Sequence, residues 1–156
     1  MPTPDFILDL RRKIGTDMLW LPGVTAVVRR DDEILLVQRS DNRMWTPITG
    51  IVDPGEQPAT AAVREAKEET GVDISVDRLA SVGATTPMAY PNGDQAVYMD
   101  HTFSCTWVSG EAYVADDESM DVGWFRVEDL PEMHHELRAR IDAALSGEIA
   151  ARFTAP

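Results

Sequence analysis

The 156-residue sequence is poor in cysteine, in basic residues and in long apolar runs, and each shortage excludes a class of protein. Cys105 is the only cysteine, so the chain cannot form an internal disulfide, and its strand-like surroundings indicate a buried, inert thiol. Fourteen Lys and Arg against 27 Asp and Glu give a net charge of −13, which argues against binding to DNA or RNA. No apolar stretch approaches the ~18 residues of a membrane span, and residues 1–10 lack a signal-peptide run. We therefore expect a cytoplasmic protein that does not bind membranes.

Helix and strand signals fill most of the chain and fit a single domain. Apolar spacing predicts an N-terminal helix over residues 4–14 and a last helix over residues 132–145, and good helix formers behind a proline predict a helix over residues 58–70. β-branched and apolar segments predict strands at residues 24–28, 34–37, 47–52, 79–84, 95–108 and 122–126, the first two as a hairpin. This order predicts an α/β fold in which helices pack on a mixed sheet.

Three glutamates of the 58–70 helix are spaced so that they share one face. Glu65, Glu68 and Glu69 stand at positions i, i+3 and i+4, where like charges repel and destabilise an isolated helix. A bound cation would offset the repulsion, and Mg²⁺ prefers oxygen ligands and keeps positions free for substrate phosphates. Glu56 can approach the same face, whereas we expect Arg64 to point to another side and to fix a neighbouring carboxylate. An exposed acidic face would show the same three glutamates, so the cluster alone does not establish a metal site.

The spacing around this cluster resembles a family signature. Five residues separate Gly50 from Glu56, seven separate Glu56 from Arg64, and the segment from Arg64 to Val72 reads REAKEETGV. Every defined position of this 23-residue pattern is similar to the signature of the Nudix hydrolase family. Many members have a glycine where this chain has Thr49, but the glycine that the pattern requires is Gly50.

The resemblance implies both a fold and a reaction. The fold would be an α/β/α sandwich with a mixed sheet, a single domain of residues 1–156 in which residues 50–72 form a loop–helix–loop. The family reaction is the attack of water on a pyrophosphate bond in a small nucleoside diphosphate derivative, such as ADP-ribose, a nucleotide sugar or a dinucleotide. Mg²⁺ would be the cofactor, with Mn²⁺ as a substitute, and a homodimer is a further expectation. A MutT-like hydrolase of damaged nucleoside triphosphates and a non-catalytic nucleotide sensor remain as alternatives.

The resemblance also implies roles for individual residues. The metal ligands would be Gly50 through its carbonyl, Glu56, Glu65, Glu68 and Glu69. Arg64 would orient the glutamates. Glu65 is the first candidate for the general base, followed by Glu68. Some members use an acidic residue of a later loop instead, and Glu118 is the candidate in the run Asp116–Glu118, which a solvated turn would explain equally well.

Arg39, Trp45 and Tyr90 are the candidate substrate contacts. Arg39 ends a predicted strand and would face the phosphates or remain a surface charge. Trp45 would stack on a base or pack against the sheet. Tyr90 nearly matches a tyrosine associated with dinucleoside polyphosphate hydrolases of the family, whereas Pro87 nearly matches a proline associated with its ADP-ribose hydrolases. The two similarities disagree, so the sequence predicts neither the nucleoside nor the group attached to it.

Overall fold

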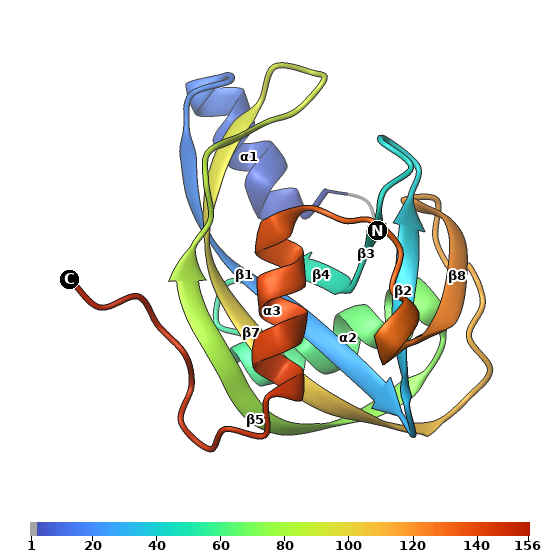
Figure 1. Cartoon of the computed structure of the whole chain (residues 1–156). Helices are drawn as coiled ribbons and strands as arrows, with labels where there is room; N and C mark the ends of the chain where they lie inside the picture. Colours follow the sequence, from blue (N-terminus) through green and yellow to red (C-terminus); the bar gives the residue numbers. More distant parts are fainter. Residues whose placement is uncertain (1–2) are drawn as a thin grey trace.

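A computed structural model describes residues 3–156, and its strands form one mixed sheet with helices on both faces (Figure 1). The elements are α1 (Asp5–Ile14), β1 (Leu19–Arg30), β2 (Glu33–Arg39), β3 (Trp45–Thr46), β4 (Ile48–Ile51), α2 (Pro58–Thr70), β5 (Asp73–Ala84), β6 (Met88–Ala89), β7 (Gln95–Ser109), β8 (Ser119–Arg126), the 3₁₀ turn η1 (Val127–Asp129) and α3 (His135–Leu145). Helix α2 covers one face, and α1 and α3 cover the other. The predicted α/β sandwich is thus confirmed, while residues 1 and 2 of the predicted domain lie outside the described residues.

Strand β1 lies at the centre of the sheet. The main strand order is β3-β2-β1-β7-β5, with β1 antiparallel to β2 and parallel to β7, and β4 also pairs with β1. Successive side chains of a strand point to opposite faces. Val24, Ala26 and Val28 accordingly pack in the cluster under α2, whereas Val27 packs in the cluster under α3. Both faces of β1 are buried over residues 23–28, which explains the apolar run there.

Helix α2 has the predicted bounds because its start, its buried face and its end are all encoded locally. Pro58 stands in the first turn, where a missing N–H costs no hydrogen bond. Ala61, Ala62 and Ala66 are fully buried, so their small side chains bring the helix close to the sheet. The helix ends at Gly71, which adopts the left-handed conformation with φ of 74°.

Helix α3 and strand β5 differ from the predicted bounds. Helix α3 begins at His135 and not at residue 132, because His134 is extended and its Nδ1 accepts a hydrogen bond from the Glu136 N–H as the N-cap. Strand β5 begins at Asp73, six residues before the predicted start at 79. Its register shifts relative to β7 and its charged residues obscure the alternating pattern.

Two buried features concern the interior of the fold. Cys105 is 1% exposed, and burial raises the pKa of its thiol to about 12, which agrees with the predicted inert thiol. Arg140 of α3 reaches the sheet, where it donates to the Thr25 hydroxyl at 3.0 Å and pairs with Asp100 at 3.3 Å.

Within residues 3–156, none of the helices has the length and apolar character needed to span a membrane.

Candidate functional site

Gly50 of β4 leaves room for the carboxyl group of Glu65. The antiparallel pairing of β4 with β1 places Gly50 opposite Val24, on the part of the sheet that α2 covers. A Cβ atom added to Gly50 would lie 2.1 Å from Glu65 Cδ. Any larger residue at position 50 would therefore occupy the space of this carboxylate, which is 2% exposed.

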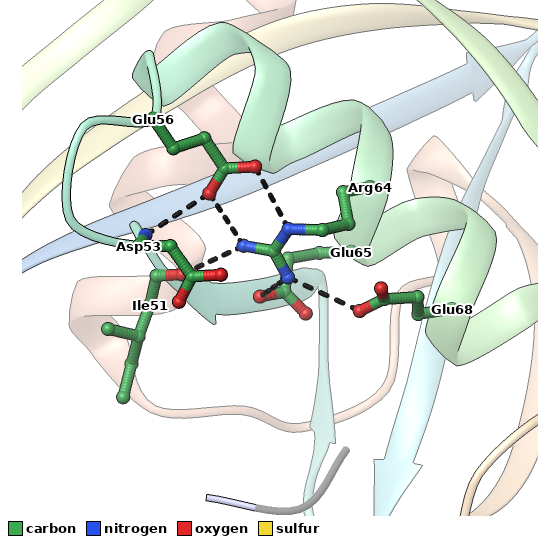
Figure 2. A network of polar contacts seen from close by, with 6 residues as sticks. All are labelled: Ile51, Asp53, Glu56, Arg64, Glu65 and Glu68. Carbon is green, nitrogen blue, oxygen red and sulfur yellow. Dashed lines mark hydrogen bonds and ion pairs between the residues drawn. The ribbon is translucent and has the colours of Figure 1, made fainter. Parts of the chain in front are cut away.

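Arg64 binds three carboxylates, as Figure 2 shows. Its Nε and Nη2 donate to the two Glu56 oxygens at 2.9 and 2.8 Å. Its Nη1 donates to Glu65 at 2.9 Å and to Glu68 at 3.2 Å, and Nη2 also reaches the Ile51 carbonyl at 3.1 Å. Arg64 thus fixes neighbouring carboxylates as expected, but the expectation that it points away from the glutamate face was wrong, because it binds Glu65 and Glu68 directly.

The pKa values of the glutamates near Arg64 diverge because their burial differs. Hydrogen bonds from Arg64 lower the pKa of Glu56. Burial raises the pKa of Glu65 to about 7, although Arg64 opposes this shift. One guanidinium shared among three carboxylates therefore does not supply enough positive charge to keep Glu65 fully ionised at neutral pH.

Glu69 is also buried and lies close to a second group of acidic residues. It is 7% exposed, and its pKa is raised well above the ordinary value, first by burial and then by the charges of Glu65, Asp116 and Glu118. Asp116 and Glu118 belong to the segment before β8, 47 and 49 positions along the chain. The fold thus brings the later acidic run to the signature helix.

A small cavity lies beside Glu69, with a volume of about 10 Å³, the space of roughly one water molecule. It is lined by Val37, Arg39, Thr46, Thr49, Glu69, Glu118 and Ser119. Three predicted site residues, Arg39, Glu69 and Glu118, therefore surround the same space. Because strand β2 ends at Arg39 and β8 begins at Ser119, the cavity is built where strand ends meet the C-terminal half of α2.

Asp41 holds Arg39 in place, a role that was not predicted from the sequence. The Arg39 Nε and Nη2 donate to the two Asp41 oxygens at 3.0 and 2.8 Å. This contact raises the pKa of Arg39 and lowers that of Asp41, and Glu118 adds to the effect on Arg39. An acidic residue two positions after a candidate phosphate contact was the signal available in the sequence.

Trp45 and Tyr90 do not line this cavity. The Trp45 ring packs edge-on against Phe125 with ring centroids 4.7 Å apart, which places it in the cluster under α3. The Tyr90 hydroxyl lies 2.7 Å from the Tyr98 hydroxyl, in the cluster under α1. Tyr90 is still close enough to Arg39 to influence its pKa. The structure thus places Arg39 at the cavity, whereas Trp45 and Tyr90 are partly buried and pack against hydrophobic clusters.

The donor atoms of the site suit a hard divalent cation, but they are not arranged around a common point. Among residues 3–156, no three Asp, Glu, His or Cys side chains are placed to hold one ion together. Arg64 instead binds oxygens of Glu56, Glu65 and Glu68. Burial nevertheless raises the pKa values of Glu65 and Glu69, and a bound cation would favour their ionised forms. The oxygen donors of the site therefore fit such an ion in their chemistry.

Comparisons with known proteins agree with this geometry. The model of the NUDIX domain matches residues 19–145. The NAD-capped RNA hydrolase NudC of Escherichia coli (strain SMS-3-5 / SECEC) is 31% identical over 112 residues, which cover 70% of this chain and 40% of that protein. The chain therefore spans about 40% of the length of the curated relatives it matches.

Two solved structures have a similar fold. A MutT NUDIX hydrolase from Burkholderia pseudomallei is 28% identical with a TM-score of 0.64, over 80% of this chain and 98% of that one. An ADP-ribose pyrophosphatase from Streptococcus suis 89-1591 is 22% identical with a TM-score of 0.63, over 85% and 96% of the two chains. At that identity, the second likeness concerns the fold alone.

Proposed function

Because the chain belongs to the Nudix hydrolase family, we propose that it hydrolyses the pyrophosphate bond of a nucleoside diphosphate derivative with Mg²⁺, or Mn²⁺ in its place, as cofactor. The observation that carries the proposal is the pair of buried carboxylates, Glu65 and Glu69. The Glu65 carboxyl group lies against Gly50, and Glu69 lines the cavity together with Arg39. A pyrophosphate is kinetically stable because its negative oxygens repel a nucleophile. A bound divalent ion neutralises that charge and lowers the pKa of a water molecule.

The signature residues would hold the ion. Glu65, Glu68 and Glu69, assisted by Glu56 and the Gly50 carbonyl, supply only oxygen donors, which Mg²⁺ prefers. Arg64 restrains three of these carboxylates through its hydrogen bonds, and we assign it an orienting role.

Glu118 is the better placed of the candidate general bases. It lines the cavity beside Glu69 and is exposed, so an attacking water could reach it. Glu65 is 2% exposed, so an attacking water reaches it less easily. Glu68 is exposed, but it does not line the cavity. Exposure and position at the cavity together favour Glu118 as the group that takes the proton from water, with Glu65 and Glu68 as the alternatives.

Arg39 is the proposed contact for the substrate phosphates, since a guanidinium can bind two phosphate oxygens at once. It lines the same cavity as Glu69 and is held there by Asp41. The relative that acts on NAD-capped RNA favours substrates in which a pyrophosphate joins two nucleosides or a nucleoside and a sugar, such as NAD or ADP-ribose. The similarity to a MutT hydrolase favours a second candidate, the hydrolysis of damaged nucleoside triphosphates.

Hydrolysis of a nucleotide panel tests the proposal. ADP-ribose, NAD, dinucleoside polyphosphates and oxidised deoxynucleoside triphosphates would be compared with Mg²⁺, with Mn²⁺ and with a chelator. We expect Glu68→Gln and Glu69→Gln to lower kcat by about 10²-fold or more, because the ion contributes several kcal/mol to transition-state stabilisation. Glu132→Gln, at an exposed position outside the site, is the matched control. Unchanged activity in both site variants would refute the metal assignment, and tight binding without turnover would indicate a nucleotide sensor.

A further inference from the structure

The segment of residues 110–118, which joins β7 to β8, lies across the C-terminal end of α2. The Tyr113 N–H donates to the Thr70 carbonyl and the Ala115 N–H donates to the Glu69 carbonyl, both at 3.1 Å. These carbonyls belong to the last turn of the helix, where no intrahelical donor remains for them. The segment therefore supplies the hydrogen bonds that the end of α2 needs, one of them at Glu69 itself.

The side chain of Tyr113 covers Gly71 at this helix end. A Cβ atom added to Gly71 would lie 2.2 Å from Cε1 of the Tyr113 ring. On the other side, a Cβ atom added to Gly110 would lie 3.0 Å from the Gly71 carbonyl oxygen. Both glycines thus permit a close approach between the segment and the helix, which residues with side chains would prevent.

The far end of the segment is attached to the end of β2. The Ser40 N–H donates to the Glu118 carbonyl at 2.8 Å, and the Ser40 hydroxyl donates to the Asp117 carbonyl at 3.3 Å. Asp116 accepts hydrogen bonds from the Glu118 N–H at 3.2 Å and the Ser119 N–H at 3.4 Å. Glu118 is consequently attached beside Arg39 through its own carbonyl, and the residues that precede it are attached to α2.

We propose that Tyr113 is a positioning residue. Its ring packs over Gly71 and thereby holds the 110–118 segment so that Glu118 faces Glu69 across the cavity. The proposal rests on the function proposed above, because it concerns the placement of a carboxylate that takes part in hydrolysis. Tyr113 is 59% exposed, so its ring adds little to the core and its effect is on the segment. A displacement of about 1 Å in a reacting group can cost about 10²-fold in rate.

Three variants separate positioning from general stability. Tyr113→Ala removes the ring over Gly71, Tyr113→Phe keeps it, and Val114→Ala shortens the adjacent exposed side chain as a control. We expect Tyr113→Ala to lower kcat by about 10- to 100-fold with a smaller change in KM, and Tyr113→Phe and Val114→Ala to stay within about threefold of the parent. A loss of activity in Tyr113→Phe equal to that in Tyr113→Ala would overturn the role of the ring contact.

A double-mutant cycle with Glu118→Gln tests whether Tyr113 acts through Glu118. If it does, Tyr113→Ala has no further effect on kcat once Glu118 is replaced, because the group that it positions is already disabled. The pH profile of kcat in Tyr113→Ala should also resemble that of Glu118→Gln. Fully additive losses in the cycle would contradict the proposal.

Amide hydrogen exchange tests the packing of Tyr113 on Gly71 without any substrate or metal ion. The amides of residues 113 and 115 should be protected in the parent protein, and Tyr113→Ala should increase their exchange by about tenfold, as expected for the loss of hydrogen bonds of ordinary strength. Unprotected amides in the parent would overturn the proposal whatever the enzyme does. The parent protein could instead show protected amides that exchange faster in Tyr113→Ala and yet hydrolyse none of the nucleotides. That result would support the packing of Tyr113 on Gly71 and refute the proposed function.

Discussion

Replacing Gly50 by alanine tests the contact on which the site is built. The new Cβ would lie 2.1 Å from Glu65 Cδ, whereas ordinary contact begins at 3.4 Å, so the carboxyl group must move by about 1.3 Å. Such a shift breaks the 2.9 Å hydrogen bond from Arg64 to Glu65, and hydrogen bonds to charged groups contribute about 1.5–3 kcal/mol. A displacement of this size in a reacting site also costs about 10²-fold in rate. We therefore expect a folded protein with a modestly lower Tm and about 100-fold lower kcat.

The assay compares Gly50→Ala with a second glycine substitution in the same sheet. Gly83 lies in β5, and a Cβ atom added there has no neighbour within 4 Å and meets no left-handed backbone conformation. Gly83→Ala should therefore leave both kcat and Tm close to the parent values. Mg²⁺-dependent hydrolysis and thermal unfolding would be measured for both variants. If Gly50→Ala stays folded and within threefold of the parent activity, the space at Gly50 is not what positions Glu65, and our reasoning fails.

Three further predictions concern charge and burial. Because burial raises the pKa of Glu65 from 4.5 to about 7, the folded state binds the proton more tightly than the unfolded state, and the metal-free protein should lose about 3 kcal/mol of unfolding free energy as pH rises from about 4.5 through 7. Denaturant titrations with a chelator at pH 5 and pH 8 measure this loss; Glu65→Gln should remove the contribution of Glu65 and leave that of Glu69, and equal stability of the parent at both pH values would refute the prediction. Arg64→Met should lower the unfolding free energy by about 3 kcal/mol at pH 8, because it leaves Glu65 buried without its partner. A denaturation midpoint equal to that of the parent would contradict the orienting role. Cys105 should resist thiol reagents in the native protein and react once per chain in urea, since its thiol is buried with a pKa of about 12; rapid labelling of the native protein would show that the β7 interior is open.

The fold could be predicted where local signals agree. The bounds of α2 were correct because a first-turn proline, buried alanines and a C-terminal glycine all indicate the same helix. The β1–β2 hairpin was also correct, since its apolar strands flank an aspartate turn. The start of α3 was wrong by three residues, because the capping role of His134 depends on its ring orientation and not on apolar spacing.

The candidate site was predictable in its composition but not in its contacts. Spacing places Glu65, Glu68 and Glu69 on one helix, but it does not indicate which of them the Arg64 guanidinium binds. The choice between base stacking and core packing at Trp45 depends on Phe125, a residue distant in the sequence. Such contacts are set by tertiary packing, for which the sequence holds no periodic signal.

The buried glutamates of α2 indicate that the helix is not optimised for stability alone. Burial opposes ionisation of Glu65 and Glu69, and the nearby acidic residues raise the pKa of Glu69 further. Apolar residues at these two positions would continue the face that Ala62 and Ala66 already bury. A helix that retains carboxylates there loses stability at neutral pH in the absence of a cation, and a divalent ion offsets that loss only if it contacts both groups. The stability of the protein should therefore depend on divalent ions more strongly as the pH rises, because the folded protein must then hold these buried carboxylates in their ionised form.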